Sequence, residues 1–308
     1  MPFAPIVLFV YNRPQHTQKT LEALAENEGA SESILYIFSD GYKANKPNDK
    51  AKIDEVRQVI RQQQWCKEVR IIEQTHNQGL APSVIQGVTQ IINQYGRIIV
   101  LEDDLVTAKG FITFMNQALD MYENENQVFG IAGNTYIDDE NLPDTYFLPI
   151  GTSWGWATWK RAWACFEQDA DKLLKRIDTE GVKKSFDFGG FPFYAILEQQ
   201  VQGIANSWAI RFYASYFFQK GIFLFPKHCL VENIGFGEES THTKGKNDFT
   251  TVIGKEHYVS LIRQEPRVEE SIKTLFEKVF KSRTVSKKQR LWASLKRKLS
   301  LIINQKSR

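Results

Sequence analysis

The sequence predicts an α/β protein with a mostly parallel central sheet flanked by helices. Short apolar runs rich in β-branched and aromatic residues alternate with amphipathic segments through the N-terminal third of the chain. This is the pattern of parallel strands joined by crossover helices. Each of the first four apolar runs also ends in polar or glycine-containing sequence. Because parallel strands end at one edge of a sheet, and ligands bind there, four such ends predict a nucleotide site.

The expected elements follow one another in a regular order. Pro14 suits the first turn of a helix, and helical spacing follows it. Residues 138–149 are rich in turn formers and are expected to form a loop. The expected strands are residues 6–10, 34–38, 69–72, 97–101, 128–132 and 221–225, and the expected helices are 17–25, 49–65, 82–95, 111–122 and a segment opening at Ser207.

Three consecutive carboxylates, Glu102, Asp103 and Asp104, directly follow the apolar run 97–101. Ionised carboxylates lose too much hydration to be buried at a strand end without a partner. A divalent metal held by oxygen ligands and shared with substrate phosphates is one solution. A solvated acidic turn is the other.

Composition narrows the class of protein. A chain of 308 residues makes one large or two ordinary domains. Cys66, Cys165 and Cys229 are odd in number and widely spaced, which favours a reducing compartment. The apolar run near the N-terminus is too short for a signal or a membrane span. We therefore expect a soluble, cytoplasmic protein.

The charge is unevenly distributed along the chain. Residues 281–308 hold ten Lys or Arg and no acid, which leaves 29 basic against 36 acidic residues, a net −7, in the remainder. An acidic body argues against nucleic-acid binding. Within the tail, residues 285–304 read as a basic amphipathic helix with Leu291, Leu295 and Leu299 on one face. Such a helix binds anionic membrane surfaces, here the inner face of the plasma membrane, unless its leucines dock it on the body.

A cluster of tryptophans lies between residues 154 and 163. Aromatic clusters usually belong to a protein core. Here glycine and hydroxyl residues alternate with the rings, which also suits a wall that stacks against a sugar. Both interpretations are open at the level of sequence.

Six short motifs occur in one order: Asn12-Arg13-Pro14, Ser39-Asp40-Gly41, Asn77-Gln78-Gly79-Leu80, Leu101-Glu102-Asp103-Asp104-Leu105, Trp154-Gly155-Trp156 and Asn233-Ile234-Gly235-Phe236-Gly237. This ordered set resembles bacterial family-2-like glycosyltransferases of the GT-A fold, and more distantly the N-acetylglucosaminyltransferase I group. The resemblance covers roughly residues 4–245. It implies a nucleotide-sugar-binding half at 1–135 and an acceptor-binding half at 136–280. The charge pattern adds a basic amphipathic tail at 281–308.

The resemblance implies a metal-dependent, inverting transfer of a hexosyl or N-acetylhexosaminyl group. The donor would be a nucleotide-sugar, expected to be a UDP-sugar. The acceptor would be a cell-surface glycan or a lipid-linked molecule, as in polysaccharide biosynthesis.

The resemblance also implies roles for individual residues. Val10, Asn12, Arg13 and Asp40 would line the nucleoside pocket, with Asp40 accepting a hydrogen bond from the base, and Asn77 and Gly79 would abut base and ribose. Glu102 and Asp103 would hold ribose and sugar hydroxyls, and Asp104, in the last place of a DXD-like triplet, would be the direct ligand of Mn²⁺ or Mg²⁺. His242 would add a second ligand, or is a surface histidine. The acceptor would lie against Trp154, Gly155, Trp156 and Trp208.

The general base departs from the pattern of the family. The N-acetylglucosaminyltransferase group has an Asp before the Trp that matches Trp208, and this chain has Asn206 and Ser207 there. An inverting transferase needs a carboxylate near the acceptor hydroxyl. The candidates are Glu198, which could equally lie on a solvated helix face, with Asp187 and Glu232 as alternatives.

The missing Asp leaves two alternatives open. The transfer could be retaining, or the chain could be a non-catalytic glycan-binding or assembly protein of the same fold. A nucleotidyltransferase ranks lower, because Asn12-Arg13-Pro14 lacks the glycines of a phosphate loop.

Overall fold

The computed structural model describes residues 2–43, 45–46, 48–137, 139–236, 253 and 258–283. His242, Gly237 and the predicted amphipathic helix 285–304 lie outside the described residues. Within the described ranges, no helix is long and apolar enough to cross a bilayer.

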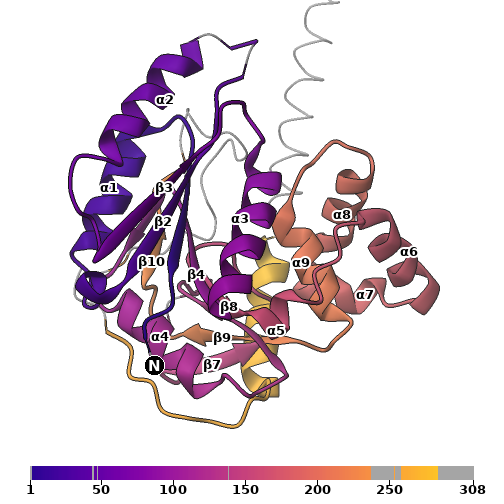
Figure 1. The fold of residues 1–308 in the computed structure, drawn as a ribbon. Coiled ribbons are helices and arrows are strands. Elements are labelled where there is room, and N and C mark those ends of the chain that lie inside the picture. The colour runs from indigo at the N-terminus through magenta and orange to yellow at the C-terminus, as the bar shows by residue number, and fades with distance from the viewer. Residues whose placement is uncertain are drawn as a thin grey trace, which may run out of the picture.

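One eight-stranded sheet forms the centre of the protein, with strand order β3-β2-β1-β4-β8-β6-β9-β7 (Figure 1). Neighbouring strands from β3 to β4 pair in parallel, as do β6 and β9, whereas β8 and β7 run antiparallel to their neighbours. The predicted fold class, mixed α/β with a mostly parallel sheet, is confirmed. The strands are β1 (Ile6–Val10), β2 (Ile34–Ser39), β3 (Glu68–Glu73), β4 (Arg97–Glu102), β6 (Val128–Ala132), β7 (Thr145–Leu148), β8 (Trp156–Trp159) and β9 (Ile222–Pro226).

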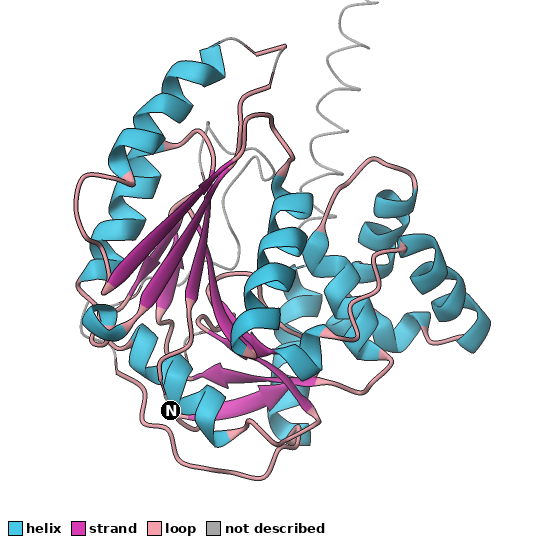
Figure 2. Cartoon of the chain, viewed as in Figure 1, coloured by secondary structure: helices cyan, strands magenta, loops and turns pink. Residues whose placement is uncertain are grey.

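Helices cover both faces of this sheet, as Figure 2 shows. Along β4, Ile98 and Val100 enter one core while Ile99 and Leu101 enter the other, because successive side chains of a strand point to opposite faces. One core is covered by α1 (Pro14–Ala25), α2 (Asn48–Val59) and α4 (Phe111–Met121), and the other by α3 (Leu80–Tyr95), α5 (Lys160–Trp163), α6 (Ala170–Glu180), α7 (Lys183–Phe186), α8 (Phe193–Val201) and α9 (Trp208–Phe217).

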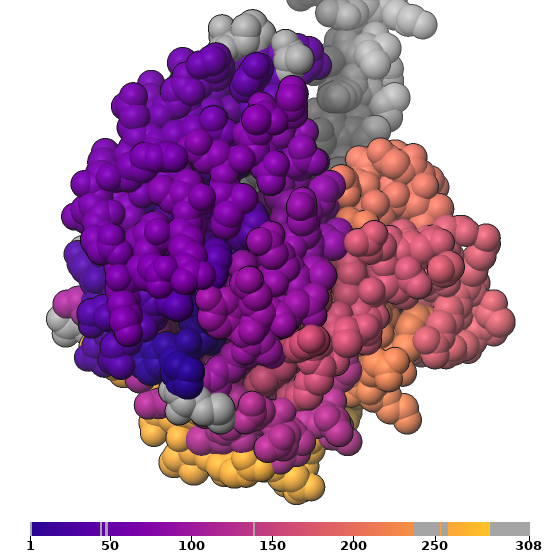
Figure 3. Space-filling view, viewed as in Figure 1, coloured from indigo at the N-terminus to yellow at the C-terminus, as the bar shows by residue number. Residues whose placement is uncertain are grey.

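The described part of the C-terminal region packs against the body. Residues 258–269 cross the outside of the molecule below α4 and β7 (Figure 3), where Gln264 Nε2 donates to the backbone oxygen of Thr145 at 2.9 Å. Residues 270–283 are helical and place Phe276 and Phe280 in the core, where Phe276 meets Tyr146 of β7 and Phe280 meets Phe188 and Phe191.

Three sequence expectations are wrong. Residues 138–149 contain strand β7, which pairs with β9, because its Tyr146 and Phe147 enter opposite cores. The helix expected at 49–65 ends at Val59, because the chain turns back to bury Trp65, whose indole N–H donates to the Ile60 oxygen at 3.1 Å. Strand β8 was not predicted at all, and it lies inside the tryptophan cluster.

Candidate active site

The three carboxylates lie where the sequence places them, at the carboxyl end of β4. We call Glu102, Asp103 and Asp104 the acidic loop; it joins β4 to β5 (Leu105–Thr107). Glu102 continues the face of β4 that carries Val100, and the Trp208 side chain lies toward it on that side, where it opposes the rise in the pKa of Glu102. Asp103 turns toward β1 and accepts from the backbone N–H of Tyr11 at 3.2 Å. The loop therefore faces two regions of the protein at once.

The acidic loop carries more negative charge than its surroundings balance. Burial, followed by the charges of Asp104 and Asp103, raises the pKa of Glu102 to about 8. Burial and the charge of Asp104 raise the pKa of Asp103 to about 7, although Arg13 opposes the shift. Opposite charges nearby would lower both pKa values, so the site is electrostatically suited to a further cation.

Arg13 is the cation that contacts the acidic loop. Its Nη1 lies 2.7 Å from Asp104 Oδ2, and its Nη2 donates to the Gly235 oxygen at 2.9 Å. A Cβ at Gly235 would lie 1.9 Å from Asp104 Oδ2, so the position requires glycine. The short sheet of β5 and β10 (Val231–Asn233) brings this segment to the loop.

Asp40 has a structural task that the sequence did not predict. Its carboxylate accepts from the backbone N–H groups of Gly41, Gln78 and Gly79 at 2.8, 2.8 and 3.0 Å. It also accepts from Asn77 Nδ2 at 2.8 Å. Because each carboxylate oxygen already accepts from two donors, the expected bond from a base to Asp40 would have to displace one of these partners. Asp40 instead fixes residues 77–79 beside the loop after β2, and Gly79 adopts a φ of +84° there.

The loop after β1 is tied to α2 by a carboxylate that sequence reasoning missed. Asp49 accepts from the Tyr11 hydroxyl at 2.9 Å and from Asn12 Nδ2 at 3.3 Å. Its only sequence signal is its position in the first turn of α2. The side chain of Val10 is buried in the core, so the expectation that it lines a pocket is wrong for the side chain.

His16 was also missed. It lies half-buried in α1, where burial and the charge of Arg13 lower the pKa of its imidazole, opposed by Asp104 and by a hydrogen bond involving the backbone of Ile234. It is thus a histidine close to the acidic loop within the described part of the chain.

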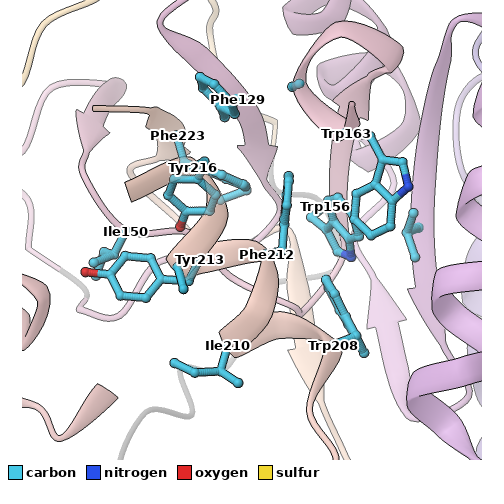
Figure 4. Packing of buried hydrophobic residues seen from close by; sticks show 14 of the residues in the cluster. Phe129, Ile150, Trp156, Trp163, Trp208, Ile210, Phe212, Tyr213, Tyr216 and Phe223 are labelled. Carbon is cyan, nitrogen blue, oxygen red and sulfur yellow. The ribbon is translucent and has the colours of Figure 1, made fainter. Parts of the chain in front are cut away.

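An aromatic cavity of about 270 Å³ lies in the C-terminal half, and no residue of the acidic loop is among those that line it. Trp154 and Trp208 line it, as expected for an acceptor wall. Trp156 does not, because it is 1% exposed in the core and stacks on Trp208 with ring centroids 5.0 Å apart (Figure 4). Gly155 is buried too, and a Cβ there would lie 2.6 Å from Val231. Of the two interpretations of the tryptophan cluster, the core is correct for Trp156, Trp159 and Trp163.

The three candidate bases lie in different surroundings. Asp187 accepts from the backbone N–H of Tyr194 at 2.8 Å, at the start of α8, and burial raises its pKa. Glu198 lies half-buried on α8, and no hydrogen bond or ion pair joins its side chain to the acidic loop within the described residues. Glu232 lies on β10, opposite Val106, next to that loop.

The metal site expected at Asp104 is only partly built by the protein. Across the described ranges, no three His, Cys, Asp or Glu side chains converge as metal ligands. Hard divalent cations are often held by one or two carboxylates together with substrate phosphates. The carboxylate of Asp104 and the excess negative charge of the loop fit that arrangement, and Arg13 is the competing cation.

Comparison with known proteins gives no family assignment. No protein-family model matches the chain. Its structural neighbours include GT-A-type glycosyltransferases and nucleotidyltransferases, at low identity and partial coverage.

Three of these neighbours are the following. A mannosyltransferase from Pyrobaculum calidifontis, in complex with GDP-Man and Mn²⁺, aligns with 12% identity and a TM-score of 0.36 over 57% of this chain and 47% of its own. TarS from S. aureus aligns with 13% identity and a TM-score of 0.28 over 46% and 24%. A cytidylyltransferase from Leptospira borgpetersenii aligns with 9% identity and a TM-score of 0.32 over 58% and 65%. The chain spans less than two thirds of the length of each of these proteins.

Proposed function

We propose that this protein is a metal-dependent glycosyltransferase that takes its sugar from a nucleotide-sugar. One observation supports this most directly. Three carboxylates lie at the carboxyl end of β4, beside the loops after β1 and β2, and one guanidinium contacts them. This edge is where α/β sheets bind nucleotides. The acidic loop also contacts Trp208, which lines the cavity in the other half.

In this proposal each residue of the site has a role. Asn12, Arg13 and the Asp40-bound loop at Asn77 and Gly79 would hold the nucleotide, with Glu102 and Asp103 toward ribose and sugar hydroxyls. Asp104 would ligate Mn²⁺ or Mg²⁺, a Lewis acid that stabilises the charge of a departing diphosphate. Arg13 lies where it would contact the same phosphates once Asp104 is engaged.

We also propose a UDP-sugar as donor and a glycan or lipid-linked molecule as acceptor. The basic segment 285–304 would hold the protein on the anionic, cytoplasmic face of the plasma membrane. Vesicle sedimentation of the full chain and of a chain ending at Arg283 tests this last point: equal sedimentation of both would exclude it.

Calorimetry with nucleotides tests the donor site. The wild type is expected to bind one of UDP, GDP or CDP more tightly with Mn²⁺ than with EDTA. Asp104→Asn removes a charged ligand without changing shape, and should weaken Mn²⁺-dependent binding by at least about tenfold, the equivalent of 1.4 kcal/mol.

Asp54→Asn is the matched control, because Asp54 is exposed and pairs only with Lys50 in the described contacts. Equal affinity of wild type and Asp104→Asn would exclude Asp104 as the ligand. Metal-dependent binding without sugar transfer would favour the non-catalytic protein. Release of pyrophosphate from a nucleoside triphosphate and a sugar phosphate would favour a nucleotidyltransferase.

Among the candidate bases, position favours Glu232. β10 continues directly into Ile234, whose backbone N–H donates to the backbone oxygen of Asp104 at 2.9 Å. Glu232→Gln is expected to lower turnover by about 10²–10⁴-fold with nucleotide affinity kept. Glu198→Gln provides the comparison and should turn over normally. If turnover falls in Glu198→Gln and not in Glu232→Gln, Glu198 on α8 is the general base instead.

A further inference from the structure

The aromatic cavity shares a wall with the acidic loop. That wall is Trp208, which is 4% exposed. Its side chain lies toward Glu102 on one side and lines the cavity on the other, and it stacks on Trp156, which pairs with Val100 of β4. Figure 4 shows Trp208 beside Trp156, on which its indole stacks with ring centroids 5.0 Å apart. A group in the cavity would therefore lie one side chain away from the carboxylates.

Four of the six hydroxyl groups that line the cavity already make a hydrogen bond within the protein, one of them being Ser207 Oγ, which accepts from the backbone N–H of Ile210. The Tyr136 hydroxyl donates to the Gly151 oxygen at 2.7 Å, and the Tyr213 hydroxyl donates to the Phe186 oxygen at 2.8 Å. Thr152 Oγ1 donates to Asn134 and accepts from the backbone N–H of Trp154. A sugar ring needs partners for several hydroxyls when it leaves water, and these four offer it little.

Apart from the hydroxyls of Ser153 and Tyr216, the remaining surface of the cavity is largely aromatic and aliphatic. Phe193 and Ile196 reach it from α8, and Trp208 and Ala209 reach it from α9. A dry apolar cavity of about 150 Å³ is large enough to hold benzene, so about 270 Å³ holds an aryl ring with a few further atoms. An empty apolar cavity lowers stability in proportion to its volume, and filling it with a ring removes that cost.

We propose that the cavity binds a compact apolar group, of the size of an aryl ring, carried by the acceptor next to the hydroxyl that receives the sugar. This rests on the proposed transfer function and adds a substrate class to it. The acceptor hydroxyl would lie at the Trp208 end of the cavity, toward Glu102, with the ring held between α8 and α9.

Benzyl alcohol is a suitable probe, because it joins an aryl ring to one hydroxyl. Saturation-transfer NMR should show saturable binding to the wild type. Ala209→Phe places a ring inside the cavity and should weaken this binding at least tenfold. Ala51→Phe makes the same change at an exposed site of α2 and should leave it unchanged.

A second variant makes the test independent of whether Ala209→Phe folds. Ile196→Ala enlarges the cavity and should raise the affinity for 2-naphthylmethanol relative to benzyl alcohol at least fivefold. No saturable binding by the wild type, or unchanged preference in Ile196→Ala, overturns the inference.

Nucleotide titration of the same samples separates the two proposals. Nucleotide and Mn²⁺ binding without any cavity binding overturns the apolar site alone. Cavity binding without nucleotide binding overturns the proposed function, and with it the assignment of the ring to an acceptor.

Discussion

Replacing Trp156 with alanine is expected to lower the free energy of unfolding by about 3–5 kcal/mol, the range for truncating a fully buried aromatic residue. Trp156 is 1% exposed and packs against Trp163, Trp208 and Phe212. Its indole N–H has no hydrogen-bond partner within the described part of the chain, so the loss would come from packing. Urea denaturation followed by circular dichroism measures it.

Trp154→Ala is the matched control. Trp154 is only half-buried, on the loop before β8, and meets Phe236 edge-on at 5.7 Å. Its removal should cost about 1 kcal/mol, a typical value for a single substitution. Equal losses for the two variants would contradict the assignment of Trp156 to the core and Trp154 to the cavity wall.

Asp40→Ala is expected to open the segment at 77–79 and to weaken nucleotide binding together. The substitution leaves the backbone N–H groups of Gly41, Gln78 and Gly79 without their acceptor. A polar group left without its partner costs about 1–3 kcal/mol where water cannot replace it. Gln78 is exposed, so water can replace the lost acceptor there. We therefore expect the ordered form of residues 77–79 to lose about 2–3 kcal/mol of stability in total. The Kd for the nucleotide should rise by roughly 10–100-fold.

Hydrogen exchange of the Gln78 and Gly79 amides, measured beside calorimetry, checks this prediction. Both amides should exchange faster in Asp40→Ala. Asp171→Ala removes an exposed carboxylate of α6 that pairs with Lys175 and should change neither readout. Faster nucleotide release with unchanged amide exchange would instead support a direct hydrogen bond between Asp40 and the base.

The sequence predicted the N-terminal half of the sheet well because its information is local. β1, β2 and β4 each contain a continuous apolar run with polar residues at its end, and that pattern is sufficient to place Asp40 and the acidic loop on one edge. Strand β8 has no such signal. It is short, it contains two tryptophans and it follows glycines, and only its pairing with Val100 and Ala132 makes it a strand.

The partners of the site residues were less predictable than their positions. That Asp40 binds backbone N–H groups depends on the path of residues 77–79, and that Asp49 holds Tyr11 depends on where α2 begins relative to β1. Arg13 pairs with Asp104 across 91 residues of sequence. Such contacts are set by the tertiary fold, so motif order could name the residues without giving their partners.

The insertion of β8 between β4 and β6 has a consequence for synthesis of the chain. β1 to β4 can pair as soon as residue 102 has emerged from the ribosome, but the free edge of β4 is covered only by residues 156–159. At 5–20 residues per second this interval lasts about 3–11 s. During that time β4 presents unpaired backbone groups, the usual template for association between chains. Nascent copies on one polysome would be most exposed to mispairing in this window.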